Sequence, residues 1–300
     1  MKEAPHVRES YSQISAEFSL IFILRGISAP FCNIESQMRC IFVSKNRKQD
    51  AVYTVSQNFL TSRRTIERLI RLAGLQKRDT VLEIGAGKGH ITKALSEACE
   101  KVISYEIDPH LYEKLKGQLD RNVLLYRGDF LTSRLPKEDY LVFANIPFFI
   151  TTDIVRKLIN ADPLPRGMWL IMEKGAAKRF CGLPKDSLMS LQIKPRYNMK
   201  IVHYFSSEDF HPAPGVDVVM LEFRRKPDSD IPPEQWASYQ KFLRHSLQYG
   251  LFGKNALLTK KQIDTALKLE GLPRLTPSGE ILYIQWLCLF RCWLRFGRPV

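Results

Sequence analysis

Apolar residues gather in seven short runs between positions 81 and 223, and glycines or polar residues separate each run from the next. Runs of this length, rich in Val, Ile, Leu, Tyr and Phe, are typical of buried β-strands. Helical spacing of apolar residues begins directly after the first run, at 91–95. The alternation predicts an α/β protein with a Rossmann-like, seven-stranded mixed sheet. The predicted strands are 81–84, 102–105, 123–126, 140–144, 168–172, 201–205 and 216–223.

An amphipathic helix is predicted over 65–73, ahead of the first strand. Its apolar residues are Ile66, Leu69, Ile70 and Ala73, which share one face at 3.6 residues per turn. Gly74 follows directly, and glycine is a common residue at the end of a helix because it tolerates positive φ.

The composition changes after position 226. Three prolines and two aspartates lie within 227–233, which is typical of a linker. Beyond it, 236–247, 260–269 and 277–296 have helical spacing and no further strand is predicted. We therefore expect three parts: an N-terminal extension at 1–50, poorly ordered, an α/β domain at 51–228, and a small all-helical domain at 229–300. The last segment holds ten Lys or Arg against five Asp or Glu.

A glycine-rich turn follows the first strand, with glycines at 85, 87 and 89 and Glu83 two positions before them. Dinucleotide-binding turns have the spacing G-x-G-x-x-G, which differs. Glu83 disfavours a pyrophosphate, whereas it would attract a cation such as the sulfonium of S-adenosylmethionine (SAM). Glu106 and Asp129 end the next two strands, where carboxylates can accept hydrogen bonds from ribose hydroxyls and an adenine amine. Three acidic strand ends favour SAM over NAD.

The fourth strand ends in Asn145-Ile146-Pro147-Phe148, which resembles the (N/D/S)-(P/I/L)-P-(Y/F) motif of amino-group methyltransferases. Together with Gln-Asn-Phe-Leu at 57–60 and Glu-Ile-Gly-Ala-Gly-Lys-Gly at 83–89, it resembles the ribosomal RNA adenine N6-methyltransferase family. The stretch 172–180, Met-Glu-Lys-Gly-Ala-Ala-Lys-Arg-Phe, is similar to the erythromycin-resistance branch, which acts on 23S rRNA. The resemblance covers about 56–295.

This resemblance implies a SAM-dependent enzyme with a SAM-binding catalytic domain at 51–228 and a helical RNA-binding domain at 229–300. It also assigns roles to individual residues. Asn58 and Leu60 are expected to cover the methionine part of SAM, and Gly85 is expected to lie under it. Glu106 is expected to bind the ribose and Asp129 the adenine amine.

The four residues of the 145–148 motif are the expected catalytic group. An adenine amine is a poor nucleophile because its lone pair is delocalised into the ring. The side-chain oxygen of Asn145, which is also expected to contact the cofactor, and the Ile146 carbonyl can orient that amine, and Pro147 fixes the direction of the carbonyl. Phe148 stands where the family usually has tyrosine, so it can stack on the base but supplies no hydroxyl. By resemblance, Phe210 borders the target pocket and offers a second stacking face.

The chain carries a net charge of +14 with a pI of about 9.5, which favours a polyanionic partner. The positive residues are clustered. Candidate RNA contacts are Arg63 and Arg64, just before the predicted helix that carries Arg68 and Arg71, together with Lys178 and Arg179. Further clusters lie at 45–48 and 224–226.

Six cysteines form no C-x-x-C pair and no zinc-like spacing with histidine, so we expect neither a metal site nor a disulfide framework. Reduced cysteines indicate the cytoplasm. The apolar run 18–24 is too short to span a membrane. Two interpretations of the N-terminal region remain: a poorly ordered extension, or translation starting at Met38.

The favoured hypothesis is a monomeric enzyme that mono- or dimethylates a specific adenine N6 in 23S rRNA, naked or during assembly, and confers macrolide-lincosamide-streptogramin B resistance. The first alternative is a 16S rRNA adenine dimethyltransferase. A non-catalytic RNA-binding protein with a SAM fold is a second alternative, which the intact 145–148 motif disfavours. An NAD-dependent oxidoreductase is disfavoured by the glycine spacing.

Overall fold

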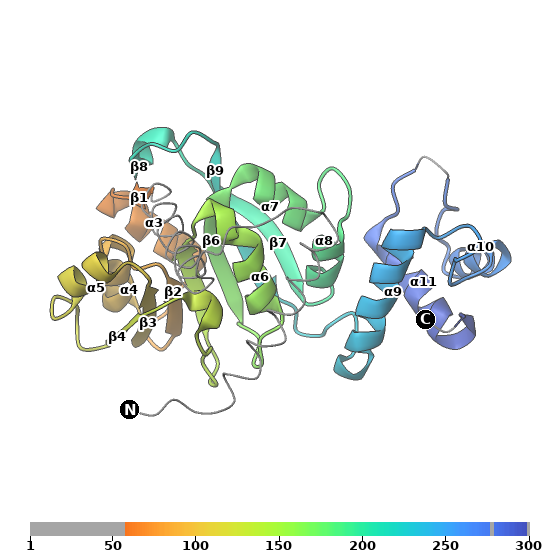
Figure 1. Ribbon diagram of the computed structural model, residues 1–300, viewed down its shortest axis with the longest axis horizontal. Helices are drawn as coiled ribbons and strands as arrows, with labels where there is room; N and C mark the ends of the chain where they lie inside the picture. Colours follow the sequence, from red (N-terminus) through yellow and green to blue (C-terminus); the bar gives the residue numbers. More distant parts are fainter. Residues whose placement is uncertain (1–57, 277–278, 299–300) are drawn as a thin grey trace, which may run out of the picture. The chain divides into compact units, whose positions relative to one another are not determined.

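A computed structural model describes residues 58–276 and 279–298 of the chain (Figure 1). The predicted extension at 1–50, the alternative start at Met38 and the glutamine of the 57–60 motif lie outside these residues. The chain divides into two units, Met1–Val52 and Tyr53–Val300, and the described residues all belong to the second unit.

The described part is built around a seven-stranded sheet in the order β4-β3-β2-β5-β6-β9-β7. The five strands from β4 to β6 are parallel, and β9 runs antiparallel to both of its neighbours. This confirms the predicted Rossmann-like fold with a mixed sheet. The strands are β2 (Thr80–Ile84), β3 (Lys101–Glu106), β4 (Val123–Arg127), β5 (Leu141–Asn145), β6 (Gly167–Glu173), β7 (Tyr197–Tyr204) and β9 (Val218–Arg225).

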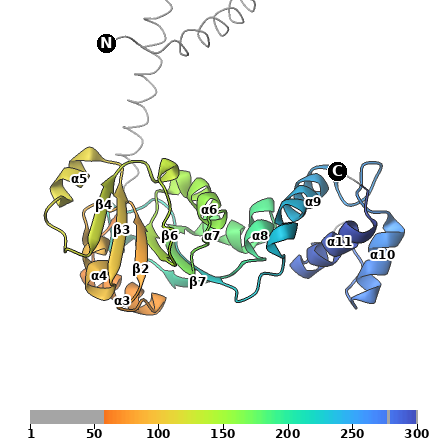
Figure 2. The same ribbon diagram turned by 90° about the horizontal axis from the view of Figure 1, so that it is seen from below.

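Helices cover both faces of the sheet, because successive side chains of a central strand point to opposite faces. In β2, Val81 packs in the cluster with α3 (Arg63–Ala73) and α4 (His90–Ala98). Leu82 packs on the other face, in the cluster with α6 (Thr151–Ile159) and α7 (Lys174–Cys181). Figure 2 shows α3 and α4 on one side of the sheet and α6 and α7 on the other. Two shorter helices, α5 (Pro109–Leu115) and α8 (Leu188–Ile193), complete this domain.

The helix predicted at 65–73 is confirmed as α3. The four residues expected on its apolar face are its buried residues. The side chain of Ser62 caps its first turn by accepting from the Thr65 N–H. Gly74 ends it in the left-handed conformation, with φ of 70°.

The C-terminal part is helical, as predicted, and consists of α9 (Trp236–Tyr249), α10 (Lys260–Leu269) and α11 (Tyr283–Phe296). The three helices bury a common core that includes Phe242, Ile263 and Phe290. The last helix is shorter than predicted, since Leu282 is extended (φ −69°, ψ 148°) and the side chain of Gln285 accepts the Leu282 N–H at 2.7 Å. This capping contact starts the helix at Tyr283 rather than near 277.

The helical segment is joined to the α/β part by direct contacts. The Tyr239 hydroxyl donates to the Leu191 carbonyl at 3.0 Å, and the Arg196 guanidinium lies 3.6 Å from the centre of the Trp236 ring. A domain boundary at 228/229 stays a prediction. Within 58–276 and 279–298, no helix combines the length and hydropathy that a membrane span requires.

Candidate functional site

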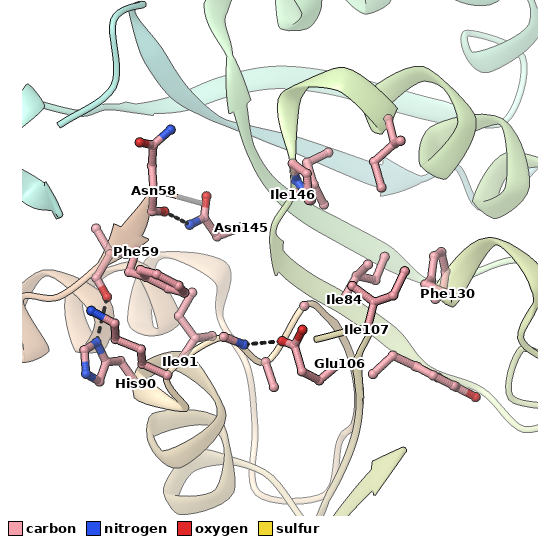
Figure 3. A pocket seen from close by; sticks show the side chains of 18 of the residues that line it. Asn58, Phe59, Ile84, His90, Ile91, Glu106, Ile107, Phe130, Asn145 and Ile146 are labelled. Carbon is pink, nitrogen blue, oxygen red and sulfur yellow. Dashed lines mark hydrogen bonds between the residues drawn. The ribbon is translucent and has the colours of Figure 1, made fainter. Parts of the chain in front are cut away.

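A cavity opens at the carboxyl ends of the parallel strands, with an empty volume of about 980 Å³ that includes space open to solvent (Figure 3). The loops after β2, β3, β4 and β5 and the segment 58–60 line it. Nine residues predicted from the sequence meet at this cavity, although they are spread over 91 positions of the chain: Asn58, Leu60, Gly85, Glu106, Asp129, Asn145, Ile146, Pro147 and Phe148.

The glycine turn lines the cavity, and its two glycines there differ in what covers them. Gly87 has φ of 57°, and a Cβ atom there would lie 2.9 Å from the Phe59 ring. At Gly85 (φ 79°) a Cβ atom would meet nothing within 4 Å. A ligand can therefore approach the backbone closely at Gly85, whereas the Phe59 ring already covers Gly87.

Glu106 is held at the end of β3 by two backbone N–H groups. Gly87 donates to its Oε2 at 2.7 Å and Asp108 donates to its Oε1 at 2.8 Å. The side chain is 3% exposed, and its burial raises the pKa of the carboxyl although the two hydrogen bonds lower it. Each carboxylate oxygen has a second lone pair, so the group can still accept two hydroxyl groups from a ligand.

Asp129 opens the loop that follows β4. Its Oδ1 accepts the Leu131 N–H at 2.8 Å and so caps the short helix η1 (Phe130–Thr132). Within the described residues its Oδ2 accepts no hydrogen bond, which leaves an acceptor at the edge of the cavity for an amine.

Asn145 ends β5 and is oriented by the segment that carries the other half of the site. Its Nδ2 donates to the Asn58 carbonyl at 2.7 Å (Figure 3), and this leaves Oδ1 as an acceptor. The Ile146 N–H donates to the Ile171 carbonyl of β6 at 3.1 Å, and Pro147 has φ of −61° and ψ of 130°. Phe148 is partly buried and packs against the core on the α3 side of the sheet.

Sequence reasoning missed two residues that shape the cavity. His90, the first residue of α4, donates through Nδ1 to the Leu60 carbonyl at 3.1 Å and thereby holds the 58–60 segment over the glycine turn. Phe59 packs on that turn, with Lys88 Nζ 4.6 Å from its ring centre. Their proximity to the predicted Leu60 and Gly89 was the available indication.

Two sequence-based expectations need correction. Glu83 does not line the cavity: it is 1% exposed, and its Oε2 accepts from the hydroxyls of Thr92 (2.7 Å) and Ser104 (2.6 Å). It therefore joins β2, β3 and α4 instead of facing a ligand. Phe210 does not reach the cavity either. It is 4% exposed, and its ring centre lies 5.2 Å from the ring centre of Phe205.

The position of Phe210 follows from a strand pairing. The short strands β1 (Phe59–Leu60) and β8 (Phe210–His211) are antiparallel, with Leu60 opposite Phe210. This pairing turns the Phe210 side chain into the core beneath the 58–60 segment. Strand β8 thus supports the 58–60 wall of the cavity, but the Phe210 ring does not face the cavity.

The arginines predicted to contact RNA differ from each other. Arg63 is paired, with Nε 2.8 Å from Glu67 and Nη2 3.2 Å from Glu97, and the hydrogen bond to Glu67 raises its pKa. Arg64 is exposed on the same helix. Neither lines the cavity.

Lys178 and Arg179 are exposed near the end of α7 and do not line the cavity. Cations in a last helical turn also stabilise the helix through its dipole, so their position fits a structural role as well as RNA contact. Within 58–276 and 279–298, no group of His, Cys, Asp and Glu side chains is arranged to hold a metal ion.

Comparisons with known proteins bear on the chemistry of this cavity. The family model "Ribosomal RNA adenine dimethylase" matches residues 47–263. The chain is 32% identical over 247 residues to an rRNA adenine N-6-methyltransferase of Enterococcus faecalis, covering 81% of this chain and 96% of the relative. It is 33% identical over 242 residues to one from Bacillus licheniformis, covering 78% and 84%.

Among solved structures, the 23S rRNA methyltransferase ErmE is similar with a TM-score of 0.67 and 27% identity, covering 79% of this chain and 99% of that one. A dimethyladenosine transferase from Plasmodium falciparum shares the fold, with a TM-score of 0.59 and 24% identity over 77% of this chain and 86% of its own.

Proposed function

The chain belongs to the ribosomal RNA adenine dimethylase family and is an rRNA adenine N6-methyltransferase, and from that premise we propose that it uses SAM to methylate an adenine of 23S rRNA. The observation that carries the proposal is the meeting of nine residues from five separate segments around one cavity. The chain is 27% identical to the 23S rRNA methyltransferase ErmE, and this similarity supports the large-subunit RNA as the proposed substrate.

The cavity has the donors and acceptors that SAM requires. Glu106 retains lone pairs for the two ribose hydroxyls, and the free Oδ2 of Asp129 can accept the adenine amine. The open space above Gly85 and the 58–60 segment can hold the methionine part. When bound, SAM supplies a methyl group on a positively charged sulfur, which makes that methyl electrophilic.

Asn145 is proposed to orient the target amine. Because its Nδ2 is held by the Asn58 carbonyl, the amide cannot rotate without losing that hydrogen bond, and Oδ1 is kept as the acceptor. An acceptor that engages the adenine N–H directs the nitrogen lone pair toward the methyl group, so catalysis depends chiefly on positioning. The Ile146 carbonyl is proposed as a second acceptor, and Phe148 as the ring that stacks on the base.

The target adenine has to leave its stack to enter the cavity, which costs a few kcal/mol and is easiest in a loop or bulge. The RNA backbone is proposed to contact the exposed arginines of α3, namely Arg64, Arg68 and Arg71, together with Lys178 and Arg179. The helical segment 229–300 is proposed to extend this surface with its excess of positive charge.

We further propose that the enzyme is a cytoplasmic monomer and that its product confers macrolide-lincosamide-streptogramin B resistance. The proposed resistance depends on methylation of 23S rRNA, so an assay of drug susceptibility tests the methylation and the resistance together. Loss of drug susceptibility in cells that express the active enzyme is the expected phenotype.

The deciding experiment is incubation of the purified protein with methyl-labelled SAM and, separately, naked 23S and 16S rRNA. The expected result is label in 23S rRNA at one adenine, identified as N6-methyl- or N6,N6-dimethyladenine by nuclease digestion and mass spectrometry. Label confined to 16S rRNA would refute the proposed substrate and favour a small-subunit dimethyltransferase. Absence of label from both, with SAM bound, would favour a non-catalytic RNA-binding protein.

A further inference from the structure

Lys157, in the last turn of α6, inserts its ammonium group into the loop that follows β4. Its Nζ donates to the carbonyls of Phe130 (2.5 Å), Leu131 (3.1 Å) and Ser133 (2.5 Å). It also lies 4.6 Å from the centre of the Phe130 ring. An ammonium has three N–H donors, so these three carbonyls use its full donor capacity.

The loop held in this way is one wall of the cavity. Asp129 and Phe130 line the cavity, whereas Lys157 does not. The front of the loop is tied by the hydrogen bond from the Leu131 N–H to Asp129, and its back is tied by Lys157. The lysine therefore acts on the cavity only through the backbone of the loop.

The same helix also contacts the loop that follows Asn145. At its first turn, the single proton of the Thr151 hydroxyl is shared between the Phe148 carbonyl (3.0 Å) and the Pro147 carbonyl (3.3 Å). The first turn of α6 thus contacts the loop proposed to orient the target amine, and its last turn contacts the loop that ends in Ser133. Both ends of α6 therefore contact segments that line the cavity.

We propose that Lys157 is a positioning residue for the adenine end of the methyl donor: it fixes the 129–133 loop so that the free Oδ2 of Asp129 meets the exocyclic amine of the donor's adenine. This inference rests on the proposed use of SAM. It predicts that Lys157 contributes to recognition of the amine itself, beyond its contribution to the stability of the loop.

Binding by calorimetry can separate these contributions, with S-adenosylhomocysteine and its deaminated analogue S-inosylhomocysteine as probes. The analogue carries a carbonyl oxygen in place of the amine, which Asp129 would repel. We expect the wild-type protein to prefer the adenosyl compound by about tenfold or more, as for loss of a hydrogen bond to a charged group. Lys157→Met is expected to lose most of this preference, and Lys157→Gln, which keeps two donors, an intermediate part of it.

Two comparisons make the result specific. Asp129→Asn should reduce the preference by itself, and adding Lys157→Met to it should reduce it little further, because both act on the same contact. Arg156→Met is the matched control: Arg156 is the neighbouring cation on α6, exposed and paired with Asp153 at 2.6 Å, and its loss should leave the preference unchanged.

A preference ratio does not depend on the fraction of folded protein, so poor folding of a variant would not imitate the effect. A wild-type preference retained in Lys157→Met, or equal weakening of both compounds, would overturn the positioning role. Failure of the wild-type protein to bind either compound would instead refute the proposed function.

Discussion

Replacing Glu83 by glutamine tests the electrostatics beneath the cavity. The Glu83 carboxyl accepts from Thr92 and Ser104 through Oε2, while its Oε1 is buried without a hydrogen-bond partner among the described residues. Burial, with a smaller contribution from Glu106, raises the pKa of Glu83 from 4.5 to about 7, although the two hydroxyls oppose the change.

The direction of the effect on stability follows from proton binding. Between pH 4.5 and about 7 the unfolded chain has lost the Glu83 proton and the folded chain still holds it. The contribution of this group to the free energy of unfolding therefore falls as the pH rises through that interval. At about 1.4 kcal/mol per pH unit, the free energy of unfolding loses roughly 3 kcal/mol of this contribution by pH 8.

Glu83→Gln removes this titration and keeps an oxygen that can accept from both hydroxyls. Relative to the wild type, the variant should therefore gain roughly 3 kcal/mol between pH 4.5 and pH 8, which corresponds to about 6–12 °C in Tm for a domain of this size. Urea unfolding followed by circular dichroism at several pH values measures the difference, in which the other titrating groups cancel. Glu113→Gln, which removes a carboxyl exposed on α5, is the control and should show no such trend.

A difference between variant and wild type that stays constant from pH 5 to pH 8 would refute the reasoning, since it would mean that Glu83 is ionised in the folded protein throughout that range. A difference that grows with pH in the Glu113 control as well would refute its assignment to the buried carboxyl.

Three further predictions concern the cavity and the proposed RNA contacts on α3. Asn145→Ala should lower methyl transfer by about 10²–10³-fold because it removes the acceptor for the target amine. Calorimetry should show S-adenosylhomocysteine binding within about threefold of wild type. Full activity of the variant would contradict the orienting role. Arg64→Glu and Arg68→Glu should each weaken RNA binding regardless of sequence and lower the salt slope by about one. In filter binding, Arg63→Glu should have a smaller effect because its guanidinium is already paired, and equal slopes in all three variants would contradict this difference. Gly87→Ala should reduce S-adenosylhomocysteine affinity, because the residue has φ of 57° and an added Cβ atom would lie 2.9 Å from the Phe59 ring, so that the turn has to shift. Unchanged affinity would exclude that turn from the binding site.

Much of the fold could be predicted from the sequence because the patterns that indicate a strand or a helix are local. A buried parallel strand needs a continuous apolar run. All seven predicted runs became strands, five of them in the parallel part of the sheet. The buried face of α3 is the face that the periodicity predicted. The residues around the cavity could also be predicted, because they stand at strand ends, and the carboxyl ends of parallel strands meet at one edge of a sheet.

What the sequence could not determine depends on contacts between distant segments. Asn145 is oriented by the Asn58 carbonyl, 87 positions away, and Phe210 is buried because its strand pairs with Leu60. Lys157 contacts a loop 24 to 27 positions before it.

Glu83 shows the same limit at a single strand. Its spacing to the glycines suggested a charge facing a ligand, but the direction of a side chain depends on which neighbours pack against each face of the strand. Here the hydroxyls of Thr92 and Ser104 lie on that face and hold the carboxyl inside. The sequence by itself thus determined which segments form the cavity, and the tertiary structure decided which side chains reach it, because periodicity specifies a buried face but not the partners that close over it.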